Sequence, residues 1–270
     1  CRKENRQIMV TAQLVKELRD RTGISMMDCK SALMESDGDI EKAIEVLRKK
    51  SVLKAEKKSG RATNEGAIVL GNSDAVDFII EVDTETDFAA KDASFQSFLE
   101  DLSAYVAENN PSDLEELNNN YKENLLGIIQ KIGENIKISY FEKMEKDEGV
   151  VASYKHSDNK LAAVVKMSGG DESVGRDIAM QVAANNPMAI YPEDIDSSVL
   201  EKEKEIALAT LANENKPDEI KEKIIMGKLN KFKMENSLVE QPFIKDPDKK
   251  IKDLLGDTKI LGFLRKKVGE

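Results

Sequence analysis

Hydrophobic residues recur at helical spacing in three short stretches near the start of the chain. The first stretch ends at Gly23, and Ser25 and Asp39 stand just before the other two, where side-chain oxygens can cap the first amide groups of a helix. The pattern predicts a three-helix module over residues 9–50 that resembles ubiquitin-associated domains. The apolar residues that set this pattern are Leu14, Val15, Leu18, Ala32, Leu33, Ile40, Ala43, Ile44 and Leu47.

Met26 and Met27 are neighbours at the start of the second predicted helix. Successive helical residues point about 100° apart. We therefore expect one methionine to pack inside the module and the other to face outward, where methionine suits an adaptable binding surface.

Residues 51–64 are rich in Lys, Ser, Gly and Ala and carry no strong apolar repeat. This shift in composition predicts a linker that is at most partly helical.

The middle of the chain repeats one pattern. Each copy begins with a glycine, Gly66 or Gly149, and continues as an apolar run, a polar turn and a second apolar run, which is typical of a β-hairpin. A helix follows in each copy and ends at an Asn-Asn-Pro sequence, at Pro111 and Pro187. The expected strands are Gly66–Gly71, Val76–Val82, Val150–His156 and Leu161–Met167.

The repeat predicts two related α/β core subdomains with antiparallel sheets, in a chain that is α+β as a whole. The first subdomain spans residues 65–147, and the second spans residues 148–192 and 233–270. Further helices around Leu114–Asn118 and Tyr121–Gly133 and a strand at Ile138–Met144 belong to the first.

A helical hairpin interrupts the second subdomain at residues 193–232. Its helices, Val199–Asn213 and Pro217–Phe232, are dense in Glu, Lys, Leu, Ile and Ala and bend at Asn213–Lys216. The apolar positions keep no strict heptad. The pattern favours a protruding antiparallel pair that associates with itself or with a partner.

The first copy of the repeat is longer, and most of its extra length lies in Thr84–Lys91, between strand and helix. Because the second copy closes without this segment, the insertion is where function is expected. Phe88 in its centre either folds back into the core or stays exposed for a partner. Asp87, taken alone, is expected to cap the following helix, as Asp92 could also do.

Charge and composition narrow the class of protein. The net charge is −10 and the sequence pI about 5, whereas nucleic-acid-binding proteins carry basic surfaces, so we expect no direct nucleic-acid contact. No apolar run is long enough for a membrane span, and the chain shows no secretory signal. Two cysteines without metal-ligand neighbours indicate a reducing, cytoplasmic setting.

Catalytic chemistry finds little support in the sequence. His156 is the only histidine, so every histidine-based triad or metal site would have to include it. No nucleophile elbow, phosphate-binding loop or zinc-binding helix motif occurs. We expect no catalytic residues, no metal site and no cofactor. A binding module of another kind and an enzyme with an unfamiliar site are the alternatives.

Several segments together resemble the elongation factor Ts family in the same order along the chain, from about Met9 to Glu270. The most specific are the N-terminal segment and Thr86–Ala93, which differs from the family sequence TDFVAKDA only at Ala89. The similar segments are Thr11–Arg19, Thr22-Gly23, Met26–Leu33, Thr86–Ala93, Lys131–Ile136, Ala183–Pro187 and Gln241–Phe243.

The resemblance implies a guanine nucleotide exchange factor that binds elongation factor Tu and promotes GDP release. The inserted tip would enter the partner's GTPase domain and disturb the Mg²⁺ and phosphate contacts of the nucleotide. The resemblance also implies a homodimer through the helical hairpin. By match, the tip residues are Thr86, Asp87, Phe88 and Ala89, and the further partner contacts are Arg19, Met26, Met27 and His156.

Two departures from the family pattern affect these expectations. Ala89 replaces a valine, which makes the tip smaller. Many relatives continue beyond the position of Glu270 into a helical segment that also touches the partner, and this predicts a lower affinity here.

Overall fold

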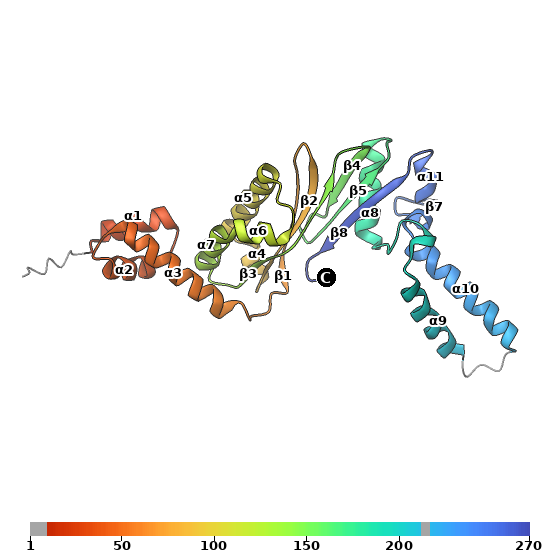
Figure 1. Ribbon diagram of the computed structural model, residues 1–270, viewed down its shortest axis with the longest axis horizontal. Helices are drawn as coiled ribbons and strands as arrows, with labels where there is room; N and C mark the ends of the chain where they lie inside the picture. Colours follow the sequence, from red (N-terminus) through yellow and green to blue (C-terminus); the bar gives the residue numbers. More distant parts are fainter. Residues whose placement is uncertain (1–9, 212–216) are drawn as a thin grey trace, which may run out of the picture. The chain divides into compact units, whose positions relative to one another are not determined.

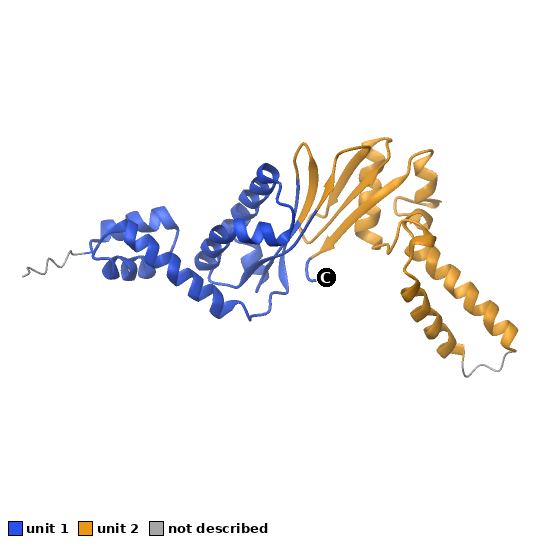
Figure 2. Cartoon of the chain, in the orientation of Figure 1, with its two compact units in different colours: residues 1–71, 80–142, 268–270 blue, residues 72–79, 143–267 orange. Residues whose placement is uncertain are grey.

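The computed structural model describes residues 10–211 and 217–270. The start of the predicted module at residue 9 and the whole predicted hairpin bend, residues 213–216, lie outside them. The protein is α+β and divides into two compact units (Figure 2). Unit 1 comprises residues 1–71, 80–142 and 268–270, and unit 2 comprises residues 72–79 and 143–267.

Unit 1 begins with three helices, as the sequence predicts: α1 (Ala12–Thr22), α2 (Met26–Glu35) and α3 (Ile40–Lys58). Gly23 ends α1 with a φ of 66°, a left-handed conformation that suits glycine. The predicted caps are confirmed, because the side chains of Ser25 and Asp39 accept hydrogen bonds from the amides three residues later. The helices enclose one core: Val15, Leu18, Ile24, Cys29, Ala32, Leu33, Ala43 and Leu47.

The segment expected as a linker is helical as far as Lys58, because α3 continues along helix α7 (Lys122–Ile132). Ser51 is buried there, where its hydroxyl donates to the Leu47 carbonyl at 2.8 Å and contacts the side-chain amide of Gln130. Lys58 Nζ donates to the Gly133 carbonyl at 2.5 Å, just after α7. Composition alone could not show this contact between distant segments.

The predicted repeat is confirmed. The first copy consists of β1 (Glu65–Asn72), β2 (Val76–Thr84) and α5 (Ala93–Asn109), and β3 (Ile136–Glu145) completes a sheet of order β1-β2-β3. The second consists of β4 (Val150–Lys155), β5 (Leu161–Met167) and α8 (Glu172–Asn185), and β8 (Ile260–Lys267) completes the antiparallel sheet β4-β5-β8. Helix α8 packs against all three strands (Figure 1).

The two repeat helices have matching ends. Asp92 and Asp171 cap them by accepting from the amides of Ser94 and Ser173, each at 2.7 Å. Asn110 and Asn186 end them in the left-handed region, both with a φ of 44°. The insertion in the first copy forms a short helix, α4 (Asp87–Lys91), and α6 (Leu114–Asn120) precedes α7.

The remainder of unit 2 holds the predicted hairpin, α9 (Ser197–Leu211) and α10 (Asp218–Asn236), which pack together around Ala207, Leu211 and Ile225. The 3₁₀ turns η1 (Pro192–Asp194) and η2 (Leu238–Glu240) flank the hairpin. Short elements follow before β8: β6 (Pro242–Phe243), β7 (Asp246–Lys250) and α11 (Ile251–Leu255). None of the helices in the described ranges has the length and apolar character that crossing a membrane requires.

Two buried glutamines join the hairpin to the rest of unit 2. Gln181 of α8 donates to the Gln241 side chain at 3.2 Å and to the Pro242 carbonyl at 3.1 Å, and its oxygen accepts from the Ile244 amide at 2.9 Å. Gln241 in turn donates to the carbonyl of Glu235, near the end of α10. This network gives Gln241 and Pro242 of the Gln241–Phe243 segment a structural role.

We predict that Gln181→Leu destabilises the protein. The leucine fills a similar volume but leaves buried donors and acceptors without partners, each at a cost of about 1–3 kcal/mol. Urea unfolding should show a loss of at least about 2 kcal/mol. The matched change Gln96→Leu, which removes one bond to the Ala90 carbonyl in unit 1, should cost less. Equal stability of Gln181→Leu and the parent protein would contradict the prediction.

Candidate functional site

Helix α4 presents an aromatic side chain to solvent from a well-anchored base. Phe88 is 82% exposed, whereas Ala89 beside it is only 4% exposed, and Ala90 is also buried. A phenylalanine that stays in water forgoes about 1.5–3 kcal/mol of burial free energy. The structure therefore decides between the two sequence alternatives for Phe88 in favour of exposure. Aromatic residues of this kind often anchor protein–protein interfaces.

A carboxylate holds the start of this helix. The Thr86 amide donates to Glu134 Oε2 at 3.1 Å, and the Thr86 hydroxyl donates to Glu134 Oε1 at 2.7 Å. The same hydroxyl oxygen caps α4 by accepting from the Ala89 amide at 3.2 Å. The buried Thr84 hydroxyl donates to the Thr86 carbonyl at 2.8 Å. Thr86 is thus fixed through its amide, its hydroxyl and its carbonyl.

A second layer of contacts supports this arrangement. The Asn135 amide donates to Glu85 Oε1 at 2.6 Å, and the Asn135 side chain donates to the Arg61 carbonyl at 2.9 Å. At the other end of α4, Gln96 Nε2 donates to the Ala90 carbonyl at 2.6 Å. Sequence reasoning assigned no role to these supporting residues. The only signal was the matching segment Lys131–Ile136, which contains Glu134 and Asn135.

The structure corrects the sequence expectation for Asp87. Thr86 caps α4, and Asp92 caps α5, so Asp87 caps neither helix. Asp87 is the first residue of α4, where its charge complements the helix dipole, and it pairs with Lys91 at 2.9 Å on the next turn. The expectation failed because it did not foresee a separate helix within the insertion.

Beneath the tip, strand β2 carries buried carboxyl groups. Burial raises the pKa of Asp83, and the nearby Glu81 carboxyl raises it further. Lys137 Nζ lies 3.5 Å from Asp83 and partly offsets this effect. No cluster of three or more His, Cys, Asp or Glu side chains in the described ranges is arranged to hold a metal ion.

Both methionines at the start of α2 are exposed, Met26 by 51% and Met27 by 76%. The expectation that one of them packs inside the module was wrong. The buried face of α2 consists of Cys29, Ala32 and Leu33, and the first turn of the helix extends beyond the core that they form. Met27 borders a shallow surface hollow that Met34 also lines.

Arg19 is an exposed residue of α1 in the same three-helix module. The module and α4 both belong to unit 1, whereas His156 belongs to unit 2. His156 follows β4 and is exposed, and its Nδ1 lies 3.0 Å from Asp158 Oδ1. The tip residues 86–89 are therefore together at the start of α4, whereas Arg19 lies on α1, Met26 and Met27 on α2, and His156 after β4.

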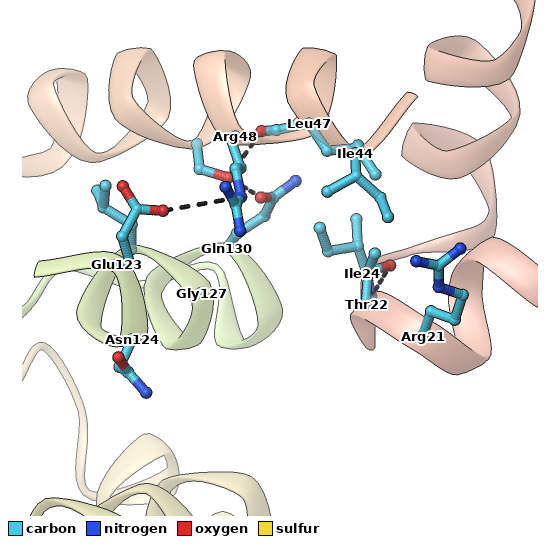
Figure 3. Close-up of a pocket in the computed structure, with 12 residues that line it drawn as sticks. Arg21, Thr22, Ile24, Ile44, Leu47, Arg48, Glu123, Asn124, Gly127 and Gln130 are labelled. Carbon is cyan, nitrogen blue, oxygen red and sulfur yellow. Dashed lines mark hydrogen bonds and ion pairs between the residues drawn. The ribbon is translucent and has the colours of Figure 1, made fainter. Parts of the chain in front are cut away.

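A cavity of about 410 Å³ lies where the three-helix module meets α7 (Figure 3). Arg48 of α3 faces Glu123 of α7 at 3.8 Å beside it, and Ile24, Ile44 and Leu47 contribute apolar walls. None of the predicted site residues lines this cavity. The candidate site is accordingly the exposed tip and not a pocket.

Comparison with known proteins gives a consistent result. The sequence model of the family described as Elongation factor TS matches residues 85–270. Elongation factor Ts of Marinobacter nauticus is 48% identical over 268 residues, which cover 97% of this chain and 91% of that protein. The proteins of the same name from Saccharophagus degradans and Clostridium kluyveri are 44% and 41% identical, each over 97% of this chain and over 92% and 94% of the relative.

Proposed function

The chain belongs to the elongation factor Ts family, and from that premise we propose that it is a guanine nucleotide exchange factor that releases GDP from elongation factor Tu during translation. It carries out no chemical reaction itself, and it works in the cytoplasm, where translation elongation takes place. When it is bound to elongation factor Tu, it weakens the binding of the nucleotide to elongation factor Tu. No nucleic acid needs to be contacted, in keeping with the net charge of −10.

The observation that carries the proposal is the exposure of Phe88 on an anchored helix. We assign α4 as the element that enters the GTPase domain, with Phe88 and Asp87 leading and Thr86 and Ala89 forming its base. The two bonds that Thr86 donates to Glu134 hold the helix before the partner arrives. Less ordering is then needed on association, which favours binding.

Thermodynamic linkage limits what the tip can do. Binding of the factor lowers the affinity of elongation factor Tu for GDP by a certain free energy. Binding of GDP must lower the affinity for the factor by the same amount. Each tenfold change in nucleotide affinity needs about 1.4 kcal/mol, and burying one phenylalanine supplies about 1.5–3 kcal/mol. The tip therefore accounts for roughly one to two decades. Disturbed Mg²⁺ and phosphate contacts in the partner, sustained by the whole interface, supply the remainder.

The remaining interface comes from the other candidate residues. We assign Arg19, Met26 and Met27 to contacts between the three-helix module and the GTPase domain. His156 is assigned to a contact near the partner's phosphate-binding loop. Exposed methionines suit such an interface because their side chains adapt to the opposing surface.

The direct test is catalysis of GDP release. A sub-stoichiometric amount of the protein should discharge fluorescent GDP from elongation factor Tu much faster than buffer does. If GDP is released no faster with the protein than with buffer alone, the proposal is overturned.

A first variant tests the anchoring of the tip. In Glu134→Gln, one acceptor oxygen must serve both Thr86 donors, so α4 loses part of its orientation. Hydrogen bonds to charged groups contribute about 1.5–3 kcal/mol, and we expect GDP release to slow by up to about tenfold. Glu123→Gln on the exposed face of α7 is the matched control and should keep the parent rate. If Glu134→Gln and Glu123→Gln both release GDP at the parent rate, Glu134 has no role in the mechanism.

We also propose that the hairpin joins two copies of the chain. The exposed apolar residues on α9 and α10 support this role: Ile206, Leu208, Ile220, Met226 and Met234. The double change Ile206→Asn and Leu208→Asn should lower the mass measured by sedimentation from dimer to monomer. Leu261→Asn, which alters an exposed apolar residue of β8, should leave the mass unchanged. A dimer in all three proteins would exclude the hairpin as the interface.

A further inference from the structure

The tight turn between β4 and β5 begins at His156, the only histidine of the chain. The His156 amide donates to the Leu161 carbonyl at 2.8 Å, and the Asn159 amide donates to the His156 carbonyl at 3.0 Å. Asn159 has a φ of 58°, a left-handed conformation that asparagine tolerates. The backbone around the imidazole is therefore held by hydrogen bonds, although the side chains of His156 and Asp158 are exposed.

Asp158 contacts both the turn and the histidine. Its Oδ1 accepts from the Lys160 amide at 2.8 Å and lies 3.0 Å from His156 Nδ1. The bond from the Lys160 amide lowers the pKa of the Asp158 carboxyl, and the bond from the imidazole lowers it further. An ionised carboxylate has no proton to donate. Nδ1 must then carry the proton in this contact.

We infer that Asp158 is a positioning residue for His156, which it holds with Nδ1 protonated so that Nε2 is the ring atom offered to elongation factor Tu. This inference rests on the proposed function, in which His156 contacts the partner. In the neutral ring, a protonated Nδ1 makes Nε2 a hydrogen-bond acceptor. The group that it meets on the partner is then a donor, such as a backbone N–H of a phosphate-binding loop.

The other charged residues near the imidazole are lysines, so we assign the selection of the tautomer to Asp158. Lys155 precedes His156, Lys160 closes the turn, and Lys267 of β8 lies opposite Leu161. An ammonium group cannot accept the Nδ1 proton. In the sequence, the only sign of this pair was a histidine followed two residues later by an aspartate. The turn between β4 and β5 brings the two side chains together.

The variant Asp158→Asn tests the inference without changing the size of the side chain. Its oxygen can still accept from the Lys160 amide, so the turn is retained. The neutral side chain lacks the negative charge that favours a proton on Nδ1, so the preference for this tautomer is weakened. Because the chain has one histidine, its ¹⁵N imidazole signals are unambiguous. The spectra should be recorded at a pH high enough that the imidazole signals no longer change as the pH is raised. We expect the parent protein to show the Nδ1–H tautomer and the variant to shift toward the Nε2–H tautomer.

Exchange measurements then connect the tautomer to function. We expect His156→Ala and Asp158→Asn each to slow GDP release several-fold. The double variant should be no slower than His156→Ala, because a residue that acts only through another adds nothing once that residue is gone. Asp74→Asn, in the corresponding exposed turn of the first copy, is the control and should keep the parent rate and stability.

The outcomes are distinct. An unchanged tautomer in Asp158→Asn overturns the positioning role whatever the exchange rates are. A slow His156→Ala with a normal Asp158→Asn, or additive losses in the double variant, overturns it while the histidine contact survives. A normal His156→Ala removes the histidine from the interface and the inference with it, but leaves exchange by the tip intact.

Discussion

Replacing Phe88 with alanine should slow GDP release from elongation factor Tu by well over tenfold and leave the protein folded. The side chain is 82% exposed, so its removal costs few contacts within the chain. We expect the free energy of unfolding to change by no more than about 0.5 kcal/mol, as for other surface substitutions. In the proposed mechanism the loss on exchange is larger, because the ring would be buried only in the bound partner, where burial contributes about 1.5–3 kcal/mol.

Two control variants distinguish a loss of exchange activity from a loss of stability. Phe95→Ala removes a fully buried ring from α5 and should destabilise the protein by about 3–5 kcal/mol. Leu261→Ala removes an exposed apolar side chain from β8 and should change neither stability nor exchange. Stopped-flow release of fluorescent GDP gives the rates, and urea unfolding gives the stabilities. A Phe88→Ala protein with the parent rate would show that α4 is not the element that enters the partner.

A large effect on stability is also expected from Gly149→Ala. Gly149 precedes β4 with a φ of 91°, a conformation that costs a residue with a side chain about 1–3 kcal/mol. A Cβ atom there would also lie 2.0 Å from the Met167 carbonyl oxygen. Backbone must move to relieve this contact, and the bonded ladder between β4 and β5 resists such movement. We expect a loss of more than about 3 kcal/mol, a large share of the 5–15 kcal/mol typical of a domain.

Unfolding in urea provides the measurement, and two more glycines provide the comparison. Gly66 occupies the equivalent place in the first copy. A Cβ atom there would lie 2.3 Å from the Val82 carbonyl oxygen, so Gly66→Ala should be similarly harmful. Gly227 lies on the exposed face of α10 with open space around it, so Gly227→Ala should stabilise the protein by about 0.5–1 kcal/mol. If Gly149→Ala unfolds within about 1 kcal/mol of the parent, the glycine is not required by the hairpin.

Short-range features of the fold were predictable because each depends on residues a few positions apart. The caps Ser25 and Asp39 bond to amides three residues later, and Gly23 ends α1 through its own conformation. The hairpins and their following helices could be recognised twice, since the same apolar runs and Asn-Asn-Pro endings recur. The insertion at Thr84–Lys91 stood out only because the second copy lacks it.

The candidate site was located by sequence but not described by it. Neither the exposure of Phe88 nor the separate helix α4 could be predicted, because both depend on which groups hold Thr86. Glu134, which holds it, is 48 positions away along the chain. The wrong expectation for Met26 and Met27 has the same origin, because helical spacing does not show where a core ends.

By itself, the sequence determined most of the elements, the repeat, the inserted segment and the resemblance that places the chain in its family. These depend on local hydrogen bonding and on the period of apolar residues, which neighbouring positions specify. Tertiary structure decided that α3 continues into the expected linker and packs on α7, and that Glu134 and the buried Ala89 hold α4 with Phe88 in water. Such contacts join residues far apart in the chain, and the pattern of either segment alone does not specify them.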